Sequence, residues 1–379
     1  MKNILNQKIN YKQYSKLINK EKIPYYSSWI DNEELNNVTK VIKSNWLSEG
    51  KITRKFEKRL AKYCGIKYGI ATNNATGGLI IALKVLGVGP GDEVIVPAFT
   101  FIASVNIIRL AGAEPVLVDV DEKSFTIDPA RVEEAITNRT KAILPVHIFG
   151  HPAEMDDILS IAKENNIRVL EDCAQALGSK YKNDHVGTLG DIGCLSFYPD
   201  KAITIGEGGL LLTNSEHYRT ELLMMKNDGR NERGMYHHDR VGYNLRTTDL
   251  QTAVGLGQLK KLDQIIQKKI NNDKFYRKQL NGINDIFFPE YSKQCFVAPH
   301  RSNILCENPQ KLSDFLLERK IGTRRFYIPI NKQPCYREYE QHFKITNKLY
   351  EQGLSLPSGP NLTKDQIDYV CSCIIEYFS

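Results

Sequence analysis

Several side chains in this sequence could bind one small molecule together. Lys201 lies in a turn just ahead of a GEGG segment, and a lysine amine is the group that binds an aldehyde. Asp172 directly follows the apolar run IRVLE, and a buried carboxylate can keep a pyridinium nitrogen protonated. Phe101, just after EVIVP, offers a flat ring on which another ring can stack. Thr76, where a helix is expected to begin, and Ser196 offer hydroxyls and N–H groups for a phosphate.

An aldehyde, a pyridine ring and a phosphate occur together in pyridoxal 5'-phosphate, so these residues predict that cofactor. Taken singly, each residue has a plainer interpretation. A lysine in a loop is usually a surface residue, an aspartate after a strand is usually a cap, and GEGG is most often a turn. The cofactor interpretation is favoured because all of these residues fall where one sheet would gather them, beyond the carboxyl ends of its strands.

The elements that must position these residues follow an α/β rhythm. Short runs rich in Val, Ile and Leu predict strands at 93–97, 115–119, 141–146, 167–171, 192–197 and 208–213. Helices are predicted at 32–43, 54–64, 76–86, 100–111, 129–136 and 152–165. This alternation predicts an α/β fold with a mostly parallel sheet that is covered by helices on both faces. A Rossmann-type nucleotide-binding module is disfavoured, because no GxGxxG segment follows the first predicted strand.

The rhythm changes after about residue 255, where a long charged helix is predicted at 259–280. We therefore expect a large domain over residues 1–255 and a smaller C-terminal domain over residues 256–379. Residues 1–25 are polar and rich in Lys and Asn, so an irregular start is expected there.

The composition is that of an ordinary globular protein, with 41% hydrophobic and 25% charged residues among 379. The net charge of +7 is spread along the chain without a basic block, so no nucleic-acid partner is expected. No segment reaches the ~18 apolar residues that a membrane span needs. The eight cysteines form no CxxC pair, so no metal site is expected. A soluble protein of the reducing cytoplasm is the resulting expectation.

Several long segments of the sequence are similar to one known family. They include NNATGGLIIALKVLGVGPGDEVIVPAFTFIASVN (73–106), VLEDCAQALGSKYKNDHVGTLGDIGCLSFYPDKAITIGEGG (169–209), GYNLRTTDLQTAVGLGQL (242–259) and IGTRRFYIPINKQP (321–334). On these segments, which occur in the family's order, the chain resembles the DegT-type sugar aminotransferases that depend on pyridoxal phosphate. The resemblance implies the aspartate-aminotransferase fold (fold type I), with a large central mixed sheet, helices on both faces and a smaller C-terminal α+β domain.

The resemblance also implies a role for each matching residue. Lys201 would be the Schiff-base lysine, and Asp172 would pair with the pyridine nitrogen. Gln175 would form a hydrogen bond near the phenolic oxygen of the cofactor, and Phe101 would stack on its ring. The residues implied to bind the phosphate are Ala75, Thr76 and Ser196.

One further implied residue concerns the quaternary structure. Asn244, in GYNLR, would reach the phosphate of the neighbouring subunit, which implies a homodimer with its active sites at the interface. The chain also departs from the family pattern at three places. Ala75 stands where the family usually has Gly, Asn331 where it often has His, and Leu245 and Thr247 flank Arg246 where Tyr and Met are usual. The change at Asn331 leaves the identity of the sugar open.

The implied reaction moves an amino group from L-glutamate to a keto-sugar nucleotide. The C-terminal part looks most like the 4-keto-6-deoxy sugar aminotransferases, so C-4 is the expected position. A nucleotide-sugar 3-aminotransferase and a cyclitol ketone aminotransferase remain as alternatives. Sugar 3-dehydratases of the same fold carry His in place of the lysine, so Lys201 argues against that reaction. A non-catalytic regulatory relative would be indicated by loss of Lys201 or Asp172, and both are present.

Overall fold

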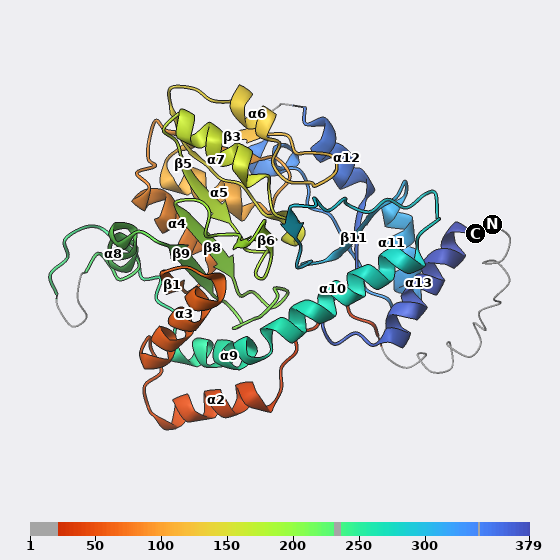
Figure 1. The fold of residues 1–379 in the computed structure, drawn as a ribbon, viewed down its shortest axis with the longest axis horizontal. Helices are drawn as coiled ribbons and strands as arrows, with labels where there is room; N and C mark the ends of the chain where they lie inside the picture. The colour runs from red at the N-terminus through yellow and green to blue at the C-terminus, as the bar shows by residue number, and fades with distance from the viewer. Residues whose placement is uncertain (1–21, 231–235, 340–341) are drawn as a thin grey trace.

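The computed structural model describes residues 22–230, 236–339 and 342–379, so most of the expected irregular start lies outside the described residues. At the centre is a seven-stranded mixed sheet of order β1-β9-β8-β5-β4-β2-β3 (Figure 1). Its strands are β1 (Tyr68–Thr72), β2 (Glu93–Pro97), β3 (Glu114–Val118), β4 (Thr140–Ile143), β5 (Arg168–Asp172), β8 (Ile192–Ser196) and β9 (Gly209–Thr213). The five strands from β8 to β3 are parallel, and β9 is antiparallel to both of its neighbours. The expected α/β architecture with a large mixed sheet is confirmed.

The helices cover both faces of this sheet. They are α3 (Lys51–Cys64), α4 (Ala75–Val85), α5 (Ala103–Ala111), α6 (Pro129–Glu134), α7 (Met155–Glu164), α8 (Glu216–Met225) and α9 (Asp249–Lys260). A further helix, α2 (Asn32–Lys43), packs on α9. Side chains alternate between the two faces, as the strand pleat requires. Val94 and Val96 enter the core beneath α4 and α5, whereas Ile95 between them enters the core beneath α3 and α7. The apolar runs in the sequence reflect this burial on both faces.

Three elements of the large sheet and its surrounding helices were not predicted, and glycines account for two of them. Gly69 lies within β1, and a Cβ there would lie 3.0 Å from the carbonyl oxygen of Glu57 in α3. In α9, a Cβ on Gly255 would lie 2.5 Å from the Phe56 ring. A Cβ on Gly257 would lie 2.8 Å from Glu34 of α2. These glycines allow close packing but weaken the strand and helix signals in the sequence. The third is α8, whose buried residues Leu222, Met224 and Met225 gather near its C-terminal end and give only a weak helical periodicity.

A smaller lobe lies at the other end of α10 (Leu262–Gln279), the long helix that connects the two parts in Figure 1. Its antiparallel sheet has the order β11-β13-β12, with bounds Ser302–Leu305, Gly353–Leu356 and Arg324–Arg325. The remaining elements include α11 (Pro309–Glu318), α12 (Lys344–Gln352), α13 (Lys364–Phe378) and the small sheet of β6 (Lys180–Tyr181), β7 (Asp184–His185) and β10 (Cys295–Phe296). In α10, Ile265 packs in the core of the large sheet and Tyr276 in that of the small lobe. The chain also returns to the large core at Ile330 and Leu349, and the domain boundary at residue 255 stays a prediction.

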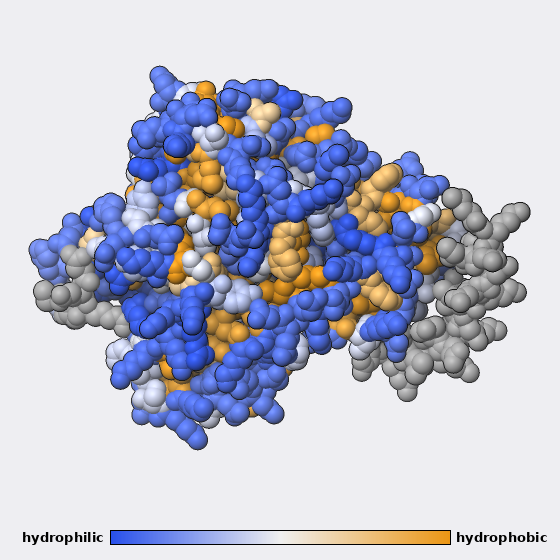
Figure 2. Space-filling view, in the orientation of Figure 1, coloured by the Kyte–Doolittle hydropathy of each residue, from blue (hydrophilic) through white to orange (hydrophobic). Residues whose placement is uncertain are grey.

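Hydrophilic residues cover most of the face seen in Figure 2. None of the helices in the described ranges combines the length and apolarity that crossing a bilayer requires. All eight cysteines are free thiols, and most of them are buried.

Candidate active site

One pocket gathers seven of the eight predicted site residues. It encloses about 290 Å³ at the carboxyl edge of the large sheet, between that sheet and the small lobe. The predicted residues that line it are Ala75, Thr76, Phe101, Asp172, Gln175, Ser196 and Lys201. Strand direction explains this gathering. β5 and β8 are parallel and end at Asp172 and Ser196, and β1 runs in the same direction because β9 is antiparallel to both β1 and β8. The loop from β1 therefore delivers the start of α4 to the same edge.

Asp172 presents a buried carboxylate to the pocket. Its side chain accepts hydrogen bonds from the Ser104 hydroxyl (2.8 Å) and from the backbone N–H of Ala174 (3.0 Å). Burial raises the pKa of the Asp172 carboxyl above its ordinary value, and these two donors only partly oppose that rise. A cationic N–H in the pocket would restore the charged form. The site therefore fits a protonated pyridine nitrogen.

Lys201 approaches the pocket from a turn after β8. Its backbone N–H donates to the carbonyl of Tyr198 (3.0 Å), and its own carbonyl accepts a hydrogen bond from the Tyr26 hydroxyl (2.6 Å). The Nζ atom lies 3.2 Å from Oδ1 of Asp200. Two hydrogen bonds thus hold the backbone, and the amine reaches the pocket where an aldehyde would need it.

The start of α4 forms the phosphate end of the pocket. Asn74 is the N-cap, and its side chain accepts a hydrogen bond from the N–H of Gly77 (2.7 Å). The first N–H groups of a helix, here those of Ala75 and Thr76, have no partner inside the helix and carry the positive end of its dipole. Gly209 in β9 makes room for this turn, because a Cβ there would lie 2.8 Å from the Ala75 nitrogen. With the Ser196 hydroxyl also lining the pocket, the donor set fits a phosphate.

Aromatic rings form the wall nearest the small lobe. The Phe101 ring centre lies 5.8 Å from that of Tyr327, and Tyr327 stacks on Phe149 at 5.9 Å. Gln175 ties this wall to the sheet, because its Oε1 accepts from the N–H of Phe149 (2.9 Å) and its Nε2 donates to the Tyr327 hydroxyl (3.3 Å). Phe101 was expected inside a helix, but α5 begins only at Ala103. It therefore lies in the loop before α5, with 51% of its surface exposed.

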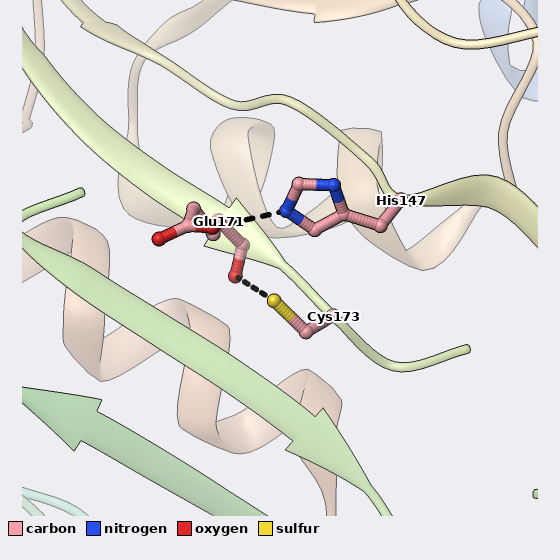
Figure 3. A group of neighbouring side chains, drawn as sticks. All are labelled: His147, Glu171 and Cys173. Carbon is pink, nitrogen blue, oxygen red and sulfur yellow. Dashed lines mark hydrogen bonds and ion pairs between the residues drawn. The ribbon is translucent and has the colours of Figure 1, made fainter. Parts of the chain in front are cut away.

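A second polar cluster lies beneath the pocket, on the opposite face of β5. Figure 3 shows Glu171, His147 and Cys173, whose ligand atoms lie within 4.8 Å of one another. Glu171 accepts hydrogen bonds from the N–H groups of residues 187, 189 and 190 and contacts Nε2 of His147 at 3.1 Å. Because Nδ1 of His147 accepts the N–H of Ala153 (3.0 Å), Nε2 carries the proton and donates it to Glu171. His147 then has no lone pair for a metal, so the cluster holds the loop and the end of β5 in place.

The eighth predicted residue, Asn244, does not line this pocket. It is exposed and forms an isolated backbone bridge with Asn227 in the segment between α8 and α9. In Figure 1 that segment projects from the body of the molecule. Arg246 anchors its base by donating to Asn227 (2.8 Å) and Asp228 (2.7 Å). Asn244 therefore does not join the other seven predicted residues in this pocket.

The pocket is also lined by residues that were not predicted from the sequence. They are Thr100, Ser104, Tyr198, Asp200, Glu207, Arg301, Arg324 and Tyr327. All of them except Arg301 lie within the segments quoted above, 73–106, 169–209 and 321–334, but no role was expected for them there. Arg301 carried no signal, because it belongs to the small lobe and reaches the pocket only through the tertiary fold.

An amine, a buried carboxylate and a helix N-terminus arranged in this way on a mixed α/β sheet define an enzyme that uses pyridoxal 5'-phosphate. Residues 28–375 match the DegT/DnrJ/EryC1/StrS aminotransferase family. The chain therefore belongs to this family, and it is an aminotransferase that depends on pyridoxal phosphate.

Individual relatives match over nearly their whole length. The chain is 38% identical to the GDP-perosamine synthase of Escherichia coli O157:H7, covering 94% of this chain and 99% of the relative. It is 34% identical to a UDP-N-acetyl-3-dehydro-alpha-D-glucosamine 3-aminotransferase of Acidithiobacillus ferrooxidans, over 90% and 93% of the two chains. The structure of DesV from S. venezuelae, in complex with a ketimine intermediate, aligns with a TM-score of 0.89 and 31% identity over 98% and 97% of the two chains.

Proposed function

We propose that this enzyme transfers an amino group from L-glutamate to a keto-sugar nucleotide, with a 4-keto-6-deoxy hexose as the acceptor. The observation that carries the proposal is Lys201, which lines the same pocket as the buried Asp172. The similarity to a GDP-perosamine synthase, which covers 94% of this chain and 99% of the synthase, supports it. The lysine favours amino transfer, because a dehydratase of this fold would have His at its position.

Each group of the pocket has a part in this proposal. Pyridoxal phosphate, when bound, draws electrons away from the carbon that carries the transferred nitrogen. Lys201 would bind the cofactor aldehyde and, once released by the donor amine, would move a proton at the donor Cα. Asp172 would keep the ring nitrogen protonated. The start of α4 would hold the phosphate, and the nucleotide would supply binding energy away from the reacting carbon.

A nucleotide-sugar 3-aminotransferase is the second candidate. The 34% identity to a 3-aminotransferase favours this candidate. The 38% identity to GDP-perosamine synthase favours the first candidate, with amination at C-4. The two candidates differ in the position of the ketone in the acceptor. Only the activity with each acceptor can therefore distinguish them, because both candidates would use the same cofactor site.

An acceptor screen tests the proposal directly. The purified enzyme, L-glutamate and cofactor would be incubated separately with 4-keto-6-deoxy sugars linked to GDP, UDP or dTDP, and with a 3-keto sugar linked to UDP. We expect 2-oxoglutarate and a 4-amino sugar to form with a 4-keto acceptor, with the aminated carbon assigned by NMR. Turnover of the 3-keto sugar alone would replace the first candidate by the second. Failure with every sugar nucleotide would contradict both.

We also propose that the enzyme is a homodimer whose partner subunit completes the pocket. Large apolar side chains are exposed on and around α2, and they include Ile30, Leu35, Ile42, Trp46 and Leu47. At the pocket, Phe101 and Tyr198 are about half exposed in the single chain. Covering these surfaces with a second copy would remove apolar area from water. Asn244, which is exposed in the single chain, would reach across such an interface.

Replacing Asn244 with alanine should weaken retention of the cofactor about tenfold, because one hydrogen bond to a charged phosphate would be lost. Equilibrium dialysis measures this, with the exposed Asn281→Ala as the control. Mixing the Asn244→Ala and Lys201→Ala proteins tests the partner role, since a mixed dimer regains one site with both residues intact. Tight cofactor binding should return in about half of the sites of such dimers. If it does not return, Asn244 does not act across the interface.

A further inference from the structure

The side chain of Arg301 is buried at the pocket wall, and some of its N–H donors are unpaired. It lines the pocket from the residue just before β11, and only 2% of its surface is exposed. Its Nη2 donates to Oδ2 of Asp200 at 3.1 Å. Its Nε and Nη1 atoms, although buried, have no acceptor among the described residues. Burying unpaired donors of a charged group costs several kcal/mol, roughly, so such an arrangement calls for a partner that arrives with a ligand.

The surroundings fix the orientation of this guanidinium group. Its central carbon lies 5.2 Å from the ring centre of Tyr25, 5.8 Å from that of Phe149 and 5.4 Å from that of Tyr327. Asp200 holds one edge of the group, and the aromatic rings restrict its other movements. A planar fork held in this way presents its remaining N–H groups in a fixed direction, which suits the two oxygens of a carboxylate.

Charge at this wall also favours an anion. Arg324 lines the same pocket, and its guanidinium carbon lies 5.7 Å from the Tyr25 ring centre. The Asp200 carboxylate is shared between Arg301 and the Lys201 amine. Burial by itself would raise the pKa of Asp200, but the charges of Lys201 and Arg301 outweigh it and lower that pKa. The Asp200 carboxylate is therefore ionised and neutralises one of the neighbouring cations, so that positive charge remains at this wall.

We propose that Arg301, held in place by Asp200, binds the carboxylate of the amino donor and thereby selects an amino acid as donor. This inference rests on the proposed function of the pocket as an aminotransferase site. The Lys201 amine and the Arg301 guanidinium contact opposite oxygens of one carboxylate, so they lie close together. An α-amino acid carries its amine and its carboxylate on the same carbon, and it can therefore span this short separation.

A diphosphate fits this position less well than a carboxylate does. In a 3- or 4-keto hexose nucleotide, the ring separates the reacting carbon from the diphosphate on C-1. When the ketone lies at the Lys201 amine, the diphosphate therefore lies a sugar ring away from that amine. Arg301 is too close to the amine to reach the diphosphate. The exposed Arg324, farther out on the wall, is better placed for it.

Binding of two unreactive probes tests this inference. Glutarate resembles the donor but has neither amine nor ketone, and GDP or UDP represents the nucleotide. Dissociation constants would be measured by calorimetry on cofactor-loaded protein, for the wild type and for Arg301→Gln. We expect the substitution to weaken glutarate binding about 10- to 100-fold and to change nucleotide binding less than about twofold. The exposed Arg337→Gln, outside the pocket, is the matched control and should change neither.

Arg301→Lys keeps the positive charge beside Asp200, so it provides a second test in case the glutamine variant misfolds. We expect it to bind glutarate less tightly than the wild type, because lysine lacks the planar fork. Unchanged glutarate binding in both variants, or absence of binding in the wild type, would overturn the inference, as would a selective loss of nucleotide binding. The visible absorbance of the bound cofactor is recorded in the same samples. It separates failure of this inference from failure of the pyridoxal-phosphate site itself.

Discussion

Replacing Lys201 with alanine should abolish amino transfer and covalent attachment of the cofactor. The amine both binds the cofactor aldehyde and moves the proton at the donor carbon, so turnover should fall by at least about 10⁴-fold. Release of 2-oxoglutarate from L-glutamate measures turnover. Borohydride reduction followed by peptide mass spectrometry measures attachment, and it should label the peptide that contains Lys201 in the wild type only. The fold should survive, because the side chain contributes an ion pair rather than core packing.

The exposed Lys180→Ala provides the control and should keep full activity. Adding a small primary amine to Lys201→Ala should restore part of the proton transfer if the missing group is the amine itself. Turnover close to that of the wild type without added amine would refute the role of Lys201. Borohydride labelling of a different lysine would reassign the site.

Replacing Asp172 with asparagine should lower turnover by about 10³-fold while the pocket keeps its shape. The amide oxygen can still accept the Ala174 N–H, and the amide NH2 group can donate to the Ser104 hydroxyl oxygen, but the side chain has no negative charge. A neutral partner no longer keeps the ring nitrogen protonated, so the electron-withdrawing power of the cofactor falls. Stopped-flow absorbance of the reaction with L-glutamate measures this step apart from sugar binding.

The pH dependence of the same step provides a second test of Asp172. Burial raises the pKa of its carboxyl, and the reaction needs the ionised form. The pyridinium of the bound cofactor opposes that rise, so the wild-type rate should decline on acidification only where this cation no longer keeps the carboxylate ionised, and Asp172→Asn should lack that decline. Ser104→Ala removes one donor to the carboxylate, so it should raise this pKa further. A rate in Asp172→Asn within about tenfold of the wild type would contradict the assignment.

Much of the cofactor site could be predicted from local patterns. Apolar runs such as those of β5 and β8 indicate buried parallel strands, and polar residues at their ends must meet at one edge of the sheet. That reasoning was enough to bring Asp172, Ser196 and Lys201 together, and the structure places all three at one pocket. The start of a helix near Thr76 could be predicted in the same way, and the structure shows Asn74 as its N-cap.

The tertiary structure alone decided the other half of the pocket. Arg301 and Arg324 lie in the small lobe, more than 100 residues from Asp172, and no periodicity connects them to the sheet. The glycines of β1 and α9 gave weak local signals because their purpose is close packing against other elements. Local sequence determined the fold class and the cofactor chemistry of this protein, since the apolar runs specify the strands and the residues at the ends of those strands specify the site. Which side chains face the substrate depended on how the two lobes pack, because that packing brings distant parts of the chain into contact.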